Sequence, residues 1–171
     1  RRQRQMCIRD RITIKKNWSY LAFILVCIML DQCSKIWCQA HITYQERRVL
    51  IPHFLDLTLV YNKGVAFSLF TNQEHLLPYF IMLLAINICG YLLHKILHNT
   101  FNSLQKIAGS LIISGAIGNI LDRLIQGQVI DFILVYYRSF SWPVFNIADS
   151  LITIGAFLFI LENLTIQRRR Y

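Results

Sequence analysis

The chain has 171 residues, of which 55% are hydrophobic and only 16% are charged. Soluble domains of this size usually carry about 25% charged residues, so the composition argues against a soluble protein. The formal net charge of +9 would suit a nucleic-acid-binding protein. The basic residues flank long apolar segments, however, an arrangement typical of membrane proteins. We therefore expect a membrane protein that binds no nucleic acid.

Four long apolar stretches follow one another along the chain, at residues 18–38, 76–94, 105–125 and 144–165. Each reaches or approaches the roughly 20 residues that a helix needs to cross a bilayer. The sequence predicts an all-α integral membrane protein, a four-transmembrane-helix bundle that occupies residues 1–171 as a single membrane domain. A soluble helical bundle would need polar helix faces, and the second stretch has none.

The first stretch has a basic flank and an apolar core, as a secretory signal peptide does. It is longer than the usual core of a signal peptide, and no small-x-small cleavage site follows it. We therefore expect a retained helix, in which Asp31 and Lys35 interrupt the apolar run.

The segment between the first and second helices, at about residues 39–75, is the only sizeable part outside the predicted membrane spans. Its residues 54–61 place leucine or tyrosine at every second position, and this period of two predicts short strands with one apolar face. We expect a small extracytoplasmic β-rich loop whose apolar face rests on the membrane or covers a binding groove. Residues 62–64 then predict a turn.

The third and fourth stretches carry polar side chains at helical spacing. Asn119, Asp122 and Arg123 share one face of the third helix, and Asn146 and Asp149 share one face of the fourth. Arg123 has two open interpretations: a structural ion pair with Asp122, or an electropositive anchor for a substrate carbonyl or a lipid headgroup. Small residues at positions 110, 114 and 118 predict the close approach of another helix.

Basic residues are divided unevenly between the two sides of the predicted membrane. Residues 1–16, the loop between the second and third helices and the C-terminal tail hold seven, two and three of them, whereas the two opposite loops together hold four. The positive-inside rule therefore predicts a multi-pass protein with both termini in the cytoplasm.

Four carboxylates fall within the outer third of the predicted bilayer when the helical rise of 1.5 Å per residue is applied, those of Asp31, Asp122, Asp131 and Asp149. A carboxylate at membrane depth costs several kcal/mol, which makes it a functional-site hypothesis. Asp131 follows the third helix and Asp149 begins the fourth, so the two can meet and share a proton. Such a pair suggests aspartic acid–base chemistry.

Two other kinds of function are less consistent with the residues. A small non-enzymatic proton or ion carrier, the alternative, would place ionisable groups along the whole membrane depth, whereas these acids cluster at one side. His94 and His98 are spaced like helical zinc ligands, but Lys95 stands where the zincin glutamate would be. We expect no metal and no cofactor.

Four blocks resemble, in order, the motifs of bacterial lipoprotein signal peptidase, also called signal peptidase II or prolipoprotein signal peptidase. They are residues 31–35 (DQCSK), 62–68 (NKGVAFS), 118–123 (GNILDR) with 129–132 (VIDF), and 145–150 (FNIADS). One departure is visible: many family members carry a second acid three residues after the first catalytic one, and Leu134 stands there in this chain.

The resemblance implies an aspartic endopeptidase of the bacterial cytoplasmic (inner) membrane, with its active site at the outer face. It would remove signal peptides from prolipoproteins by cleaving N-terminal to a diacylglyceryl-modified cysteine, in contact with membrane lipid, and globomycin-type cyclic peptides would inhibit it. The catalytic roles map onto Asp131 and Asp149. Substrate-binding or supporting roles map onto Asn62, Gly64, Asn119, Arg123 and Asn146, and structural polar roles map onto Asp31, Lys35 and Asp122.

Overall fold

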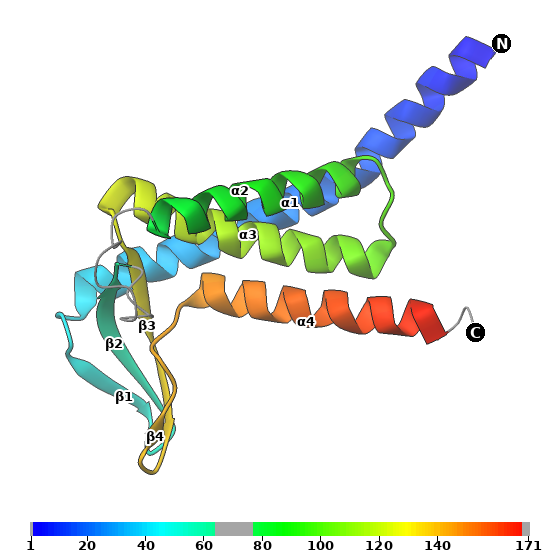
Figure 1. Ribbon diagram of the computed structural model, residues 1–171. Coiled ribbons are helices and arrows are strands. Elements are labelled where there is room, and N and C mark those ends of the chain that lie inside the picture. The colour runs from blue at the N-terminus through cyan, green and yellow to red at the C-terminus, as the bar shows by residue number, and fades with distance from the viewer. Residues whose placement is uncertain (1, 64–76, 169–171) are drawn as a thin grey trace.

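A computed structural model describes the fold of residues 2–63 and 77–168 (Figure 1). Its four helices are α1 (Arg2–His41), α2 (Leu77–Leu97), α3 (Ser103–Gln126) and α4 (Ile147–Arg168). Each contains a segment long and apolar enough to cross a membrane, at Asn17–His41, Tyr79–Leu97, Ser103–Gln126 and Ile147–Thr165. The expectation of a bundle with four membrane-spanning helices is therefore confirmed.

The helix bounds differ from the predicted ranges at several ends. α1 begins at Arg2 because the basic flank is helical too, and it extends beyond the bundle in Figure 1. α2 continues to Leu97. α4 begins at Ile147 rather than at residue 144 because the backbone of Phe145 is hydrogen-bonded to Ile133 of the sheet. The predicted first residue of the second helix, at position 76, lies outside the described residues.

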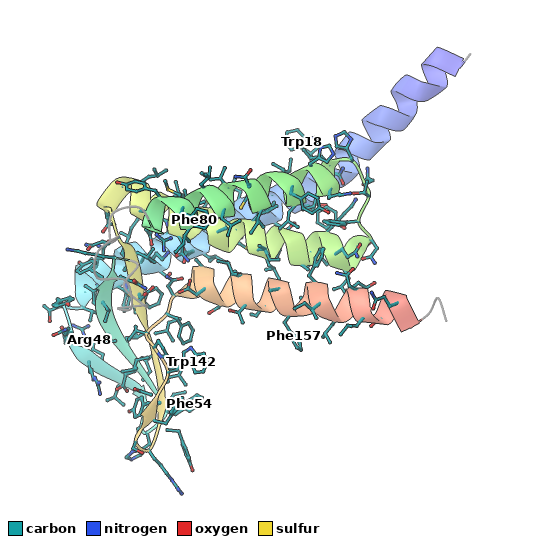
Figure 2. The ribbon with its side chains drawn as sticks, in the orientation of Figure 1. Trp18, Arg48, Phe54, Phe80, Trp142 and Phe157 are labelled. Carbon is teal, nitrogen blue, oxygen red and sulfur yellow. The ribbon has the colours of Figure 1, made fainter. Side chains whose placement is uncertain are left out.

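α3 is the central helix of the bundle. It contacts each of the other three helices, whereas α2 and α4 expose large apolar side chains, among them Phe80 and Phe157 (Figure 2). This distribution suits lipid contact, because a membrane-facing helix surface needs no polar side chains.

Small residues bring the backbones of α3 and its neighbours close together. A Cβ atom added at Gly115 would lie 2.2 Å from the carbonyl oxygen of Ala148 on α4. The predicted stripe at positions 110, 114 and 118 does face another helix, α1: Ser114 donates to the Ile24 carbonyl at 3.3 Å. A Cβ at Gly118 would lie 2.5 Å from Asp31 Oδ2.

A four-stranded antiparallel sheet, in the order β1-β2-β3-β4, lies at the end of the bundle opposite the chain termini (Figure 1). β1 (Arg47–Ile51) and β2 (Leu55–Asn62) come from the α1–α2 connection, as predicted. β3 (Val129–Tyr137) and β4 (Phe140–Ser141) come from the α3–α4 connection. The sequence does not predict β3, because residues 129–135 form a short apolar run whose periodicity does not separate strand from helix.

The predicted apolar face of β2 is only partly correct. Leu59 packs in a core with Cys38 of α1, with Ile42 just after the end of α1, and with β3. Asp56, expected on the polar face, is also buried, and it accepts a hydrogen bond from the Tyr136 hydroxyl at 3.1 Å. Every residue of β2 is buried or half-buried, so neither face of the strand is fully exposed, and the register is irregular between Leu57 and Val60.

Aromatic side chains are gathered on one side of the sheet. Phe54 and Trp142 lie on the side toward which α4 extends, and Arg48 lies on the other side (Figure 2). Together with residues of β3 and β4, the two aromatic side chains line an apolar groove of about 330 Å³.

Candidate active site

The two aspartates expected to react come from different kinds of element. Asp131 is the third residue of β3, is cross-strand partner to Val60 and is only 3% exposed. Asp149 lies in the first turn of α4 and is half-buried. The α3–α4 connection thus returns the chain so that a strand residue and a helix residue meet at one end of the bundle.

The start of α4 places Asp149 through a reciprocal cap. The Asn146 side-chain oxygen accepts from the backbone amide of Asp149 at 2.8 Å, and Asp149 Oδ2 accepts from the amide of Asn146 at 3.3 Å. This is the pattern of a capping box, in which the side chain of each of two residues at a helix start accepts a hydrogen bond from the backbone amide of the other. A local helix-start signal therefore orients the candidate catalytic carboxylate.

Asn146 also joins the two aspartates. Its Nδ2 donates to Asp131 Oδ1 at 2.7 Å, while its Oδ1 holds the amide of Asp149. Asn62 donates to Asp131 Oδ2 at 3.0 Å, and Asn119 donates to Asp149 Oδ1 at 2.8 Å. Every carboxylate oxygen of the pair thus accepts a hydrogen bond, and the three asparagines singled out in the sequence all lie at this site.

The pKa of Asp131 is raised, as expected for a carboxyl group that holds a proton. Burial raises the pKa of Asp131 to about 6 from its ordinary value of 3.8. The hydrogen bond from Asn62 opposes the increase, and the nearby charge of Asp149 adds to it. Desolvation and a like charge both disfavour the ionised form, as in carboxylate pairs that share a proton.

A second buried cluster adjoins the pair. Lys35 lies 2.8 Å from Asp31 and 2.7 Å from Asp122, and all three side chains are at most 1% exposed. Lys35 also donates to Asn119 Oδ1 at 3.2 Å, which links this cluster to the asparagine beside Asp149. Gln32 donates to both acids, at 3.2 and 2.9 Å. Gln32 lies within the DQCSK block, but the sequence pattern predicts no role for it.

The structure separates the two interpretations of Arg123. Among the described residues, the cation paired with Asp122 is Lys35, not Arg123. Arg123 is half-buried, donates from Nη1 to the carbonyl of Asn119 at 3.3 Å and interacts electrostatically with Asp149. Its guanidinium therefore lies at the site near the carboxylates of Asp149, Asp122 and Asp131, and it makes no close ion pair among the described residues. Gly64, the remaining predicted site residue, lies outside the described residues.

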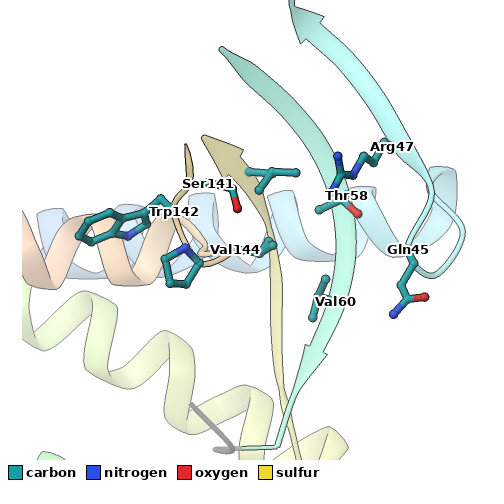
Figure 3. A pocket seen from close by; sticks show the side chains of 9 residues that line it. Gln45, Arg47, Thr58, Val60, Ser141, Trp142 and Val144 are labelled. Atoms are coloured by element: carbon teal, nitrogen blue, oxygen red, sulfur yellow. The ribbon is translucent and has the colours of Figure 1, made fainter. Parts of the chain in front are cut away.

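A cavity of about 670 Å³ opens on the sheet and is lined by residues of β1, β2, β3 and β4 and by the segments next to them (Figure 3). Val60, the cross-strand partner of Asp131, forms part of its wall. One side of the cavity carries the polar side chains of Gln45, Arg47 and Thr58. Trp142 and Val144 line the opposite side. Leu134, which replaces the second acid of the family pattern, is buried in the same wall.

Comparisons with known proteins identify one family. The family model described as "Signal peptidase (SPase) II" matches residues 23–165. A lipoprotein signal peptidase of Neisseria gonorrhoeae is 44% identical over 152 residues, which cover 89% of this chain and 93% of the relative. One of Chromobacterium violaceum is 38% identical over 151 residues, covering 87% and 93%.

Solved structures show the same fold. A bacterial membrane enzyme determined by the in meso method at 2.3 Å resolution superposes with a TM-score of 0.77 at 29% identity, covering 90% of this chain and 92% of that one. A second, at 1.9 Å resolution, superposes with a TM-score of 0.74 at 30% identity, covering 85% and 92%. Because the family model matches most of the length of this chain, the chain belongs to the signal peptidase II family of aspartic peptidases.

Proposed function

We propose that Asp131 and Asp149 are the catalytic pair with which this protein removes signal peptides from prolipoproteins. The observation that carries the proposal is the position of Asn146, which is hydrogen-bonded to both aspartates at once. Asn146 donates from Nδ2 to the Asp131 carboxylate and from its backbone amide to the Asp149 carboxylate, so both carboxyl groups adjoin one residue. Membership of an aspartic peptidase family supports the same assignment.

The reaction would need one proton shared between the two carboxyl groups. The ionised carboxylate accepts a proton from a water molecule, whose oxygen attacks the scissile carbonyl carbon. The protonated carboxyl donates its proton to the carbonyl oxygen, and a tetrahedral species forms. The leaving nitrogen takes a proton from the pair as the C–N bond breaks, and one hydroxyl proton of the tetrahedral species returns to the pair. The products are a carboxylic acid and an amine, and the two carboxyl groups again share one proton.

The surroundings of the pair favour a lipid-modified substrate. We propose cleavage N-terminal to a diacylglyceryl-modified cysteine, because the pair lies where the membrane-spanning helices meet the sheet. Acyl chains can then stay in the bilayer while the peptide bond reaches the aspartates. The cavity of about 670 Å³ is large enough for the polypeptide beyond the cysteine.

Lipid and inhibitor contacts follow from the same geometry. We propose that the aromatic groove around Phe54 and Trp142 meets membrane lipid, since aromatic rings favour the boundary between headgroups and acyl chains. Globomycin-type cyclic peptides would compete with substrate at the pair. Arg123, which makes no close ion pair among the described residues, would bind a substrate carbonyl.

We place the pair at the outer face of the inner membrane, with both termini in the cytoplasm. The sheet and the chain termini lie at opposite ends of the bundle (Figure 1), and the basic residues are concentrated at the end with the termini. Because the sheet is built from both outer connections, we propose that residues 1–171 act as one membrane domain. A proton or ion carrier is disfavoured, since α2 contains no acidic residue.

Asparagine substitutions test the assignment of the pair. We expect Asp131→Asn and Asp149→Asn each to abolish cleavage of a diacylglyceryl-modified peptide, while the purified proteins keep the wild-type thermal midpoint within a few degrees. Asp56→Asn is the matched control for Asp131→Asn, because Asp56 is equally buried on the same sheet but its side chain, in the described part of the chain, bonds only to Tyr136. Full activity of either dyad variant would refute the assignment.

A further inference from the structure

The buried cluster of Asp31, Lys35 and Asp122 has no part in the proposed chemistry. It contains two carboxylates and one ammonium, and its side chains are at most 1% exposed. Replacing a buried ion pair by apolar residues is often neutral or stabilising, so helix packing alone does not require such a cluster. A cluster with more acids than cations is harder still to explain as a packing device.

Each acid of the cluster accepts a hydrogen bond from the backbone amide directly before one of the two dyad aspartates. Asp122 Oδ2 accepts from the amide of Ile130 at 3.3 Å, and Asp31 Oδ1 accepts from the amide of Ala148 at 2.8 Å. One amide belongs to β3 and the other to α4. Lys35 bonds to both acids, so a single ammonium group connects the two backbones.

We propose that Asp31, Lys35 and Asp122 form a positioning clamp that sets the separation of the Asp131 and Asp149 carboxyl groups. The proposal rests on the assignment of these two aspartates as the catalytic pair. Along the chain, β3 and α4 are joined through the hairpin and the segment at residues 138–146. The clamp adds a second connection, through α1 and α3, at the positions where the separation matters.

The clamp also reaches the dyad through Asn119. Lys35 donates to Asn119 Oδ1 at 3.2 Å, and Asn146 donates to the same oxygen at 3.2 Å. Because both contacts engage Oδ1 of Asn119, its Nδ2 is directed at Asp149 and donates a hydrogen bond to Asp149 Oδ1 at 2.8 Å. Because a misplacement of about 1 Å can lower a catalytic rate about 100-fold, loss of the clamp should act on turnover.

Asp122→Asn separates a positioning role from a structural one. The substitution removes one of the two negative charges and leaves the Lys35–Asp31 ion pair, so we expect a thermal midpoint equal to or above that of the wild type. We nevertheless expect kcat to fall about 10- to 100-fold, with KM changed less than about twofold, since the clamp is buried and touches no substrate. Asp31→Asn should behave in the same way.

Gly118→Ala provides an uncharged second variant. The added Cβ would lie 2.5 Å from Asp31 Oδ2 and would displace that carboxylate without changing any charge. We expect the same fall in kcat. Gly109→Ala is the control on the same helix, because its Cβ would lie 3.5 Å from the nearest atom, an ordinary contact.

Three results would overturn the clamp: wild-type kcat in Asp122→Asn, a raised KM with unchanged kcat, or a loss of kcat that only follows a loss of folded protein. These outcomes are distinguishable from failure of the dyad assignment. If Asp131→Asn is inactive and Asp122→Asn has full activity, the clamp is wrong and the dyad stands. If Asp131→Asn is active, the dyad assignment fails first.

Discussion

The spacing between α3 and α4 next to the dyad can be altered by a single methyl group, Gly115→Ala. The added Cβ would lie 2.2 Å from the Ala148 carbonyl oxygen, and an ordinary contact begins at 3.4 Å. α4 must therefore move away by about 1.2 Å, the difference of these two distances. Ala148 directly precedes Asp149, so the candidate catalytic carboxylate moves with it.

The expected size of the effect follows from this displacement. A misplacement of about 1 Å can lower a rate about 100-fold, and overpacking a close contact typically costs about 1–3 kcal/mol of stability. Helix propensity acts in the opposite direction, since alanine is favoured over glycine by about 1 kcal/mol in a helix interior. We therefore expect a modest fall in stability together with a loss of kcat of about 100-fold.

The assay is steady-state cleavage of a fluorescent diacylglyceryl-modified peptide by purified protein in lipid, combined with thermal unfolding. Gly155→Ala is an informative comparison, because its Cβ would lie 2.7 Å from the Ala108 carbonyl and would overpack the same helix pair farther from the dyad. It should lose stability with a smaller loss of kcat. A Gly115→Ala protein with wild-type kcat would contradict the link between helix spacing and catalysis.

Three further predictions concern the hydrogen bonds and the proton of the dyad. With a folded-state pKa of about 6 for Asp131, kcat/KM should fall as pH rises through about 6, because the pair then loses its shared proton; a pH series checks this. The folded pKa lies above the ordinary 3.8, so the stability that Asp131 contributes is present at low pH and is lost as pH rises through about 6, which thermal midpoints along the same series would show. Asn62→Ala removes a hydrogen bond that lowers the pKa of Asp131, so the fall in kcat/KM should move to higher pH. A fall in kcat/KM at the wild-type pH, or at a lower pH, would argue against the assignment. Asn146→Ser keeps an N-cap acceptor of similar strength, but it removes the buried amide that donates to Asp131 and Asn119, so stability should fall by about 1–3 kcal/mol. We expect kcat to fall as well, because Asp131 loses this donor, and steady-state rates and thermal unfolding measure the two effects.

Local and compositional physics made much of this protein predictable from its sequence. Apolar length alone indicates four membrane spans, because a helix must satisfy its own backbone in lipid over about 20 residues. The acids could be placed at one depth from the helical rise. The short-range pattern at Asn146 and Asp149 is a helix-start signal, so its geometry is largely local.

Contacts between distant segments were decided only by the tertiary structure. β3 is a short apolar run that acquires its strand conformation by pairing with β2, about 70 positions earlier in the chain. The partner of Asp122 is Lys35 on α1 rather than Arg123, because adjacent residues on one helix do not face each other, whereas the packing of α1 brings Lys35 to the Asp122 carboxylate. That long-range choice leaves Arg123 at the site and places two buried acids against the backbone beside the dyad. Sequence spacing describes what one helix presents, whereas the packing of α1, α3 and α4 determines which of those groups meet.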